Sequence, residues 1–176
     1  MPQRLRRLST SVSSASRLKT TSGCMQTVAK VCVVHDGSVL LLRRSQNEEQ
    51  RRGEWDIPGG SVELGERDIE GCVREAYEEA GLRLRPSDMV PVFVPESMQP
   101  PGRRRRMYIV WLEERPLVRL SEEHTEFQWC GLDDLPQVFD HPVWPVLLLR
   151  YLREAEQAGE CVQSPLSAVT IGVAPS

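Results

Sequence analysis

Residues 60–82 have the sequence GSVELGERDIEGCVREAYEEAGL, and the second half of this stretch predicts a helix from Arg67 to Ala80. The prediction follows from apolar residues that recur at helical spacing, at positions 69, 72, 73, 76 and 80. Gly81 comes next as the expected stop, since glycine readily takes the left-handed conformation that ends helices. The stretch therefore predicts an amphipathic helix that buries one face.

Three glutamates, Glu75, Glu78 and Glu79, fall on a second face of this helix. Like charges at these spacings repel one another, and negative charges near a helix C-terminus oppose the helix dipole. Conflicts grouped in this way indicate a functional site, and a hard divalent cation with oxygen ligands would relieve them. Gly71, one turn before Glu75, has two interpretations: it leaves room for a metal or phosphate, or it allows close packing.

The same stretch is similar to the signature box of the Nudix hydrolases. Ala76 stands where a larger aliphatic residue is usual, a difference that concerns packing and not chemistry. The resemblance implies an α/β fold, specifically the Nudix-type α/β/α sandwich with a mixed sheet. The positions that carry it are Gly60, Glu66, Arg74, Glu75, Glu78, Glu79 and Gly81.

By this resemblance the chain is an enzyme that hydrolyses a pyrophosphate bond with Mg²⁺, for which Mn²⁺ substitutes. The expected metal ligands are the Gly60 carbonyl and the carboxylates of Glu75, Glu78 and Glu79. The expected catalytic residues are Glu75, Glu78 and Arg74, with Glu75 or a nearby glutamate as general base. Arg74 is expected to hold a glutamate such as Glu66 or Glu75 through a bidentate pair.

Family members often add an acid from outside the box, and Glu126, at the start of a predicted strand, is the candidate metal ligand here. The candidate substrate-binding residues are Trp55, Trp129 and Arg44. The two tryptophans are candidates because aromatic rings stack on bases, although a single tryptophan is more often a core residue. The basic run 103–106 is either a solvated loop or a contact for phosphate or RNA.

The resemblance implies that the substrate is a nucleoside diphosphate linked to another moiety, with two candidates: a nucleoside triphosphate, ordinary or oxidised, and a nucleotide sugar. The alternative function is a Nudix-fold module that binds a nucleotide or RNA without catalysis. The complete carboxylate set favours the enzyme. Neither the substrate nor a monomeric or homodimeric state follows from the sequence.

Composition places the chain among globular proteins: it has 176 residues, of which 40% are hydrophobic and 27% charged. No apolar run approaches the length that spans a bilayer, so no membrane partner is expected. The five cysteines lack metal-ligand spacing and indicate a reducing compartment, which favours a cytoplasmic location. The net charge of −3 includes a basic N-terminal segment, so the body is more acidic and a nucleic-acid partner is not expected.

Three segments are predicted: residues 1–25, a Nudix domain at 26–159, and a tail at 160–176. The first segment is rich in serine and basic residues and free of acids up to Asp36. It has the composition of an organelle transit peptide, which would give a mitochondrial or other organellar location. A basic tail, or an upstream extension before a start at Met25, is the competing interpretation.

Within the domain, Asp36-Gly37 predicts a tight hairpin between two apolar runs. A strand containing Pro91 is expected at a sheet edge, because proline cannot donate to the ladder. Pro58-Gly59-Gly60 is expected to be loop, and Leu132–Pro136 a turn. The remaining expectations are a second amphipathic helix between Pro142 and Gly159, and strands at 28–34, 38–43, 89–94, 107–112 and 126–130.

Overall fold

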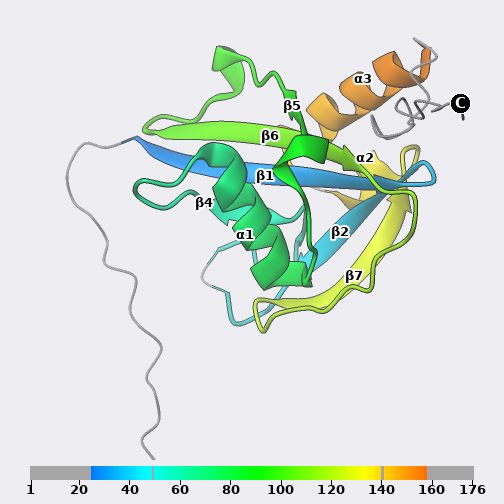
Figure 1. Cartoon of the computed structure of the whole chain (residues 1–176), viewed down its shortest axis with the longest axis horizontal. Coiled ribbons are helices and arrows are strands. Elements are labelled where there is room, and N and C mark those ends of the chain that lie inside the picture. Colours follow the sequence, from blue (N-terminus) through cyan, green and yellow to red (C-terminus); the bar gives the residue numbers. More distant parts are fainter. Residues whose placement is uncertain (1–24, 49, 140, 158–176) are drawn as a thin grey trace, which may run out of the picture.

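The structure is a computed structural model that describes residues 25–48, 50–139 and 141–157. A mixed sheet lies between helices, as the ribbon in Figure 1 shows, which confirms the expected α/β fold. The strands are β1 (Gln26–His35), β2 (Ser38–Arg44), β3 (Trp55–Asp56), β4 (Gly59–Ser61), β5 (Val90–Val92), β6 (Arg103–Trp111) and β7 (His124–Gly131). The helices are α1 (Asp68–Ala80), α2 (Leu135–Val138) and α3 (Trp144–Gln157).

Strand β1 lies at the centre of the sheet and has a different helix layer on each face. Ala29, Val31 and Val33 are buried in the cluster that contains the apolar stripe of α1. Cys32 and Val34, which alternate with them, are buried in the cluster that contains the apolar face of α3. Successive strand residues point to opposite faces, so one strand supplies two separate cores.

The β1–β2 hairpin forms at Asp36-Gly37 as expected, with φ of +47° and +66° at the two turn residues. After Val34↔Val39 the two strands separate, because β2 continues by pairing with β7 and β3. The vacated edge of β1 is taken by β4 over Val28 to Lys30. The separation of β1 from β2 opens the sheet beside β4, and the pocket described below lies there.

The predicted helix over 67–80 is present as α1, with Gly81 in the left-handed conformation at its end. Strand β5 lies at the edge of the sheet, as Pro91 predicted. In the part of the chain that the structure describes, no helix is long and apolar enough to cross a membrane. The expectations for residues 1–24 and 160–176 lie outside the described residues.

Two local expectations were wrong. Of the two interpretations of the basic run 103–106, the solvated loop is wrong, because the run begins strand β6 by pairing in parallel with the start of β1. Gly59 and Gly60 belong to the short strand β4 instead of a loop, again through pairing with β1. The predicted turn at 132–136 is present over residues 132–134 and leads directly into the one-turn helix α2. In the first two segments, pairing across the sheet outweighs weak local strand preference.

Candidate active site

The carboxylates of Glu75 and Glu79 come from α1 and are almost completely buried, with 5% and 4% of each residue exposed. Both reach a pocket of about 390 Å³ at the edge of the sheet beside β4. The main-chain N–H of Gly59 donates a hydrogen bond to Oε2 of Glu79 at 2.8 Å. The residue just before the motif thus holds a carboxylate that the C-terminal half of the motif supplies.

Two glycines of β4 are required for this arrangement. A Cβ at Gly60 would lie 2.6 Å from Oε2 of Glu75, closer than real Cβ contacts allow. A Cβ at Gly59, where φ is +126°, would lie 2.2 Å from the carbonyl oxygen of Ala29 in β1. The missing side chains therefore let β4 pair with β1 while the glutamates of α1 approach its backbone.

Arg74 is the hub of the carboxylate group. Its Nε and one terminal nitrogen donate to both oxygens of Glu66, at 3.0 and 3.1 Å, which is the bidentate pair expected from the motif. Its other terminal nitrogen donates to Glu75 and Glu78, each at 3.0 Å. Glu78 is exposed, with 53% of its side chain accessible, and it does not line the pocket. Arg74 thereby fixes the side chains of Glu66 and Glu75 relative to each other.

Gly71 makes room for Glu66 and not for a metal. A Cβ at this position would lie 2.8 Å from Oε2 of Glu66 and 3.3 Å from the side chain of Val62. Of the two interpretations offered by the sequence, the structure supports close packing.

A buried ion-pair network forms the floor of the pocket. Lys30 Nζ lies 3.1 Å from Asp56 Oδ2 and donates to the carbonyl of Ile57. Arg51 reaches the same carboxylate oxygen at 3.0 Å. Burial favours the neutral form of Asp56, but the charges of Lys30 and Arg51 outweigh it and lower the pKa of Asp56. Asp56 is therefore an acceptor already in use, and the network lines the pocket beside the glutamates.

The surroundings of Glu79 disfavour its ionised form. Burial, reinforced by the neighbouring charge of Glu75, raises its pKa to about 7, although Lys30 and the Gly59 N–H act in the opposite direction. Nε2 of His124 is 4.0 Å from Oε1 of Glu79. Burial, with the charges of Lys30 and Arg44, lowers the pKa of His124 to about 4. His124 is thus neutral at pH 7, and its contact with Glu79 is not an ion pair.

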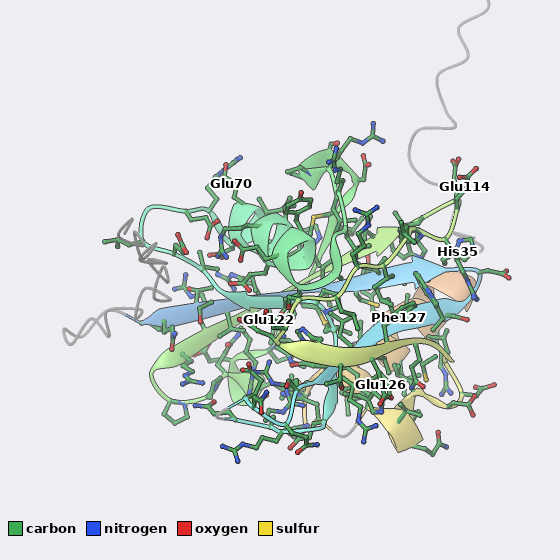
Figure 2. All side chains as sticks on the ribbon, turned by 90° about the horizontal axis from the view of Figure 1, so that it is seen from below. His35, Glu70, Glu114, Glu122, Glu126 and Phe127 are labelled. Carbon is green, nitrogen blue, oxygen red and sulfur yellow. The ribbon has the colours of Figure 1, made fainter. Side chains whose placement is uncertain are left out.

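Several residues singled out from the sequence do not lie together. Arg44 lines the pocket, where it pairs with Glu48 at 2.8 Å. Trp55 and Trp129 are not among the pocket-lining residues, and each packs against one of the two cores. Glu126 also lies outside the pocket and pairs with Arg43 of β2 at 3.1 Å. The side-chain view in Figure 2 places Glu126 and Phe127 on opposite sides of β7.

Other pocket residues gave no signal in the sequence reading. Lys30 belongs to a strand that the sequence predicts to be buried, and Asp56 to the short strand β3, which the sequence did not predict. His141 precedes the predicted second amphipathic helix. Trp144, the first residue of α3, also lines the pocket. A charged residue inside an apolar strand run, as at Lys30, was the one available hint, because buried charges are rare unless paired.

The donor set suits an oxygen-preferring divalent cation. Glu75 and Glu79 present carboxylates to the same pocket that Gly60 lines, and the space a Cβ at Gly60 would fill lies against Glu75. Among the described residues, no three acidic, histidine or cysteine side chains are clustered closely enough to hold a metal as they stand. The third expected carboxylate, Glu78, is instead paired with Arg74. The residues therefore fit a cation that takes two buried carboxylates and completes its shell with other oxygens.

Comparison with known proteins identifies one known domain over most of the chain. A family model described as the NUDIX domain matches residues 25–151. A MutT-like protein from Streptomyces ambofaciens is 29% identical over 140 residues, which cover 78% of this chain and 80% of that protein. The nucleoside triphosphatase NudI of Escherichia coli K12 is 28% identical over 119 residues, covering 62% of this chain and 84% of NudI.

Solved structures share the fold. The crystal structure of a MutT protein from Methanosarcina mazei Go1 is 25% identical, with a TM-score of 0.52, and covers 77% of this chain and 95% of that chain. A binary complex of a Caenorhabditis elegans Ap4A hydrolase has a TM-score of 0.58 at 22% identity, and covers 75% of this chain and 98% of that chain. At that identity the second likeness concerns the fold alone.

Proposed function

The chain belongs to the Nudix hydrolase family, and we propose that it cleaves a pyrophosphate bond in a nucleoside diphosphate linked to another moiety. The observation that supports this most directly is the pair of buried carboxylates, Glu75 and Glu79, at the wall of a pocket with basic side chains. Carboxylates buried together at a pocket wall are costly to maintain, and a cation with a polyphosphate would offset that cost.

We propose Mg²⁺ as the cation, with Mn²⁺ able to replace it. Glu75, Glu79 and the carbonyl of Gly60 would hold it, and Glu78 would join them by exchanging its ion pair with Arg74. Bound there, the ion would supply charge neutralisation at the phosphates and a water of lowered pKa. Glu126 has no place in this set, because it lies outside the pocket and is paired with Arg43.

The protein's own residues orient the reacting groups and accept a proton. Glu75 is the proposed general base, since it lies at the pocket beside Gly60 and its carboxylate is fixed by Arg74 at 3.0 Å. Arg74 acts as a positioning residue, because its other contacts are with Glu66, Glu78 and the main chain and it does not line the pocket. Arg44, which does line it, is the basic side chain we retain from the sequence as a substrate contact.

The proposed substrates remain the two classes read from the sequence. The relationship to NudI, a nucleoside triphosphatase, favours a nucleoside triphosphate. A nucleotide sugar would present the same anhydride with a neutral group beyond it. Trp55 and Trp129 are dropped as stacking residues, because both lie outside the pocket.

A substrate panel tests the proposal. The protein is incubated with nucleoside triphosphates, an oxidised nucleoside triphosphate and nucleotide sugars. Released phosphate is then detected with inorganic pyrophosphatase as the coupling enzyme for the triphosphates and alkaline phosphatase for the nucleotide sugars. We expect turnover with Mg²⁺ or Mn²⁺ and none in excess chelator.

The matched variants for this panel are Glu75→Gln and Glu126→Gln, which remove the same charge inside and outside the pocket. The first should lower turnover at least tenfold, which corresponds to about 1.4 kcal/mol of barrier, and the second less than twofold. Full activity in chelator, or equal effects of the two variants, would overturn the assignment. Nucleotide binding without turnover would identify a binding module instead.

A further inference from the structure

The four arginines of the basic run face opposite sides of the sheet. Their register with β1 places Arg103 and Arg105 on the side of Val28 and Lys30, and both line the pocket. Arg104 does not line it, and Arg106 pairs at 2.9 Å with Asp68 of α1 on the other side. Strand formation thus divides one run of like charge, and only its odd-numbered half faces the pocket.

Neither Arg103 nor Arg105 has a carboxylate partner among the described residues. The guanidinium of Arg105 lies 5.7 Å from the ring centroid of Trp144, and its terminal nitrogen donates to the carbonyl of Met98. Burial, together with the positive charges of Arg103 and Arg51, lowers the pKa of Arg105. This end of the pocket therefore concentrates positive charge that its neighbours do not neutralise.

Arg51 adds an unused donor. Its Nε and one terminal nitrogen are taken by Glu54 and Asp56, but its second terminal nitrogen is buried with no hydrogen-bond partner among the described residues. A buried donor without a partner costs free energy unless a ligand or water satisfies it. The position of Arg51 in the pocket lining makes a ligand oxygen a suitable partner.

His141 contributes a fourth donor of fixed orientation. Its Nδ1 accepts the main-chain N–H groups of Val143 at 3.1 Å and Trp144 at 3.2 Å, at the start of α3. A ring nitrogen that accepts two hydrogen bonds carries no proton, so the proton of neutral His141 is on Nε2. Burial, with the charge of Arg51 next, lowers the pKa of His141 to about 4, and the neutral form therefore predominates at pH 7.

Donors without acceptors point to a phosphate. Phosphate oxygens only accept hydrogen bonds, whereas a sugar or a base presents donors that would need acceptors in return. Asp56, the pocket carboxylate that Arg51 reaches, is shared between Lys30 and Arg51. We propose that this end of the pocket is a distal phosphate subsite, formed by Arg51, Arg103, Arg105 and His141, for a substrate phosphate that lies beyond the two phosphates of the cleaved anhydride.

The proposal rests on the proposed function, because the subsite and the glutamates share one pocket. It also narrows that function. A nucleoside triphosphate can place a further phosphate in the subsite, whereas a nucleotide sugar would place a neutral group against three guanidinium groups. The structure thus favours the triphosphate class on grounds independent of any relative.

Binding of inorganic pyrophosphate in excess chelator tests the subsite without the metal. The comparison is between the full-length protein, Arg105→Gln and Arg104→Gln, measured by isothermal titration calorimetry at low salt. Arg104 is the matched control, since it is an exposed neighbour in the same strand that does not line the pocket. We expect Arg105→Gln to weaken binding at least fivefold and Arg104→Gln less than twofold.

Arg103→Gln provides a second test if Arg105→Gln does not fold, because Arg103 is exposed and has no described carboxylate partner. Equal weakening by the pocket-facing and control variants, or no pyrophosphate binding by the parent protein, would overturn the subsite. In kinetics, Arg103→Gln should raise KM for nucleoside triphosphates at least fivefold while changing KM for nucleotide sugars less than twofold.

These outcomes separate the two proposals. Glu75→Gln should lower turnover at least tenfold yet bind pyrophosphate in chelator at least as well as the parent, because it removes a negative charge from the pocket. If no nucleotide of the panel is hydrolysed but Arg105→Gln still weakens pyrophosphate binding selectively, the subsite holds and the proposed function fails. If hydrolysis is normal and the arginine variants behave alike, the subsite is wrong and the function holds.

Discussion

Replacing Glu79 by glutamine connects the stability of the metal-free protein to the proposed chemistry. The residue is 4% exposed, accepts the Gly59 N–H at 2.8 Å, and has a pKa raised from 4.5 to about 7, chiefly by burial. Glutamine keeps the size and an acceptor oxygen for Gly59 but cannot ionise. The substitution therefore removes a buried charge with little change in packing.

The magnitude follows from the linkage between proton binding and folding. Below pH 4.5 the carboxyl is protonated in both the folded and the unfolded states, so its ionisation costs nothing. Between pH 4.5 and about 7 the unfolded chain releases the proton and the folded protein retains it, so stability falls as pH rises. Each pKa unit is worth about 1.4 kcal/mol, and the total cost above pH 7 is therefore about 3 kcal/mol.

Denaturant unfolding of the metal-free protein at pH 5 and pH 8 measures this difference. We expect Glu79→Gln to match the parent within about 1 kcal/mol at pH 5 and to exceed it by about 2–3 kcal/mol at pH 8. Mg²⁺ should then stabilise the parent more than the variant, because a ligand stabilises through its affinity for the folded state. Turnover of the variant should fall at least tenfold.

Glu126→Gln is the control, since that carboxylate is exposed and pairs with Arg43 at the surface. If Glu79→Gln destabilises the metal-free protein at pH 8 while turnover is unchanged, Glu79 is a structural residue and both its electrostatic role and its assignment as a ligand are wrong.

Three further predictions concern the same region. Gly60→Ala should lower turnover at least tenfold, because its Cβ would lie 2.6 Å from the Glu75 carboxylate; unchanged kinetics would show that this approach is unimportant. Arg74→Lys should lower the free energy of unfolding by about 1–3 kcal/mol in denaturant titrations, because lysine cannot make the bidentate pair with Glu66; a neutral result would contradict a hub role. A chain beginning at Met25 should keep the melting temperature and activity of the full chain, and a large loss of either would make residues 1–24 part of the folded unit.

The sequence predicted the motif helix closely because all of its local signals agree. The apolar stripe, the left-handed stop at Gly81 and the hairpin turn at Asp36-Gly37 depend on residues a few positions apart, and each is present. The pair between Arg74 and Glu66 was also predictable, since both residues belong to one short motif.

Where the sequence left two interpretations open, the choice depended on partners distant in the chain. The basic run 103–106 has little strand preference of its own, and it becomes strand only because β1 offers a ladder to pair with. Trp55 and Trp129 resembled stacking residues by type, yet their positions in the sheet direct them to the cores. Residue type alone does not say which face of a strand meets a pocket.

The sequence by itself determined the family, the mixed α/β architecture and the glutamates of α1, because these are carried by closely spaced residues whose preferences act along the chain. Only the tertiary structure decided which basic and aromatic side chains meet those glutamates, such as Lys30, Arg105 and His141. These residues come from strand, loop and helix-start positions far apart in the chain. Their meeting depends on the separation of β1 from β2 and on the register of β6, which are fixed by packing across the whole sheet.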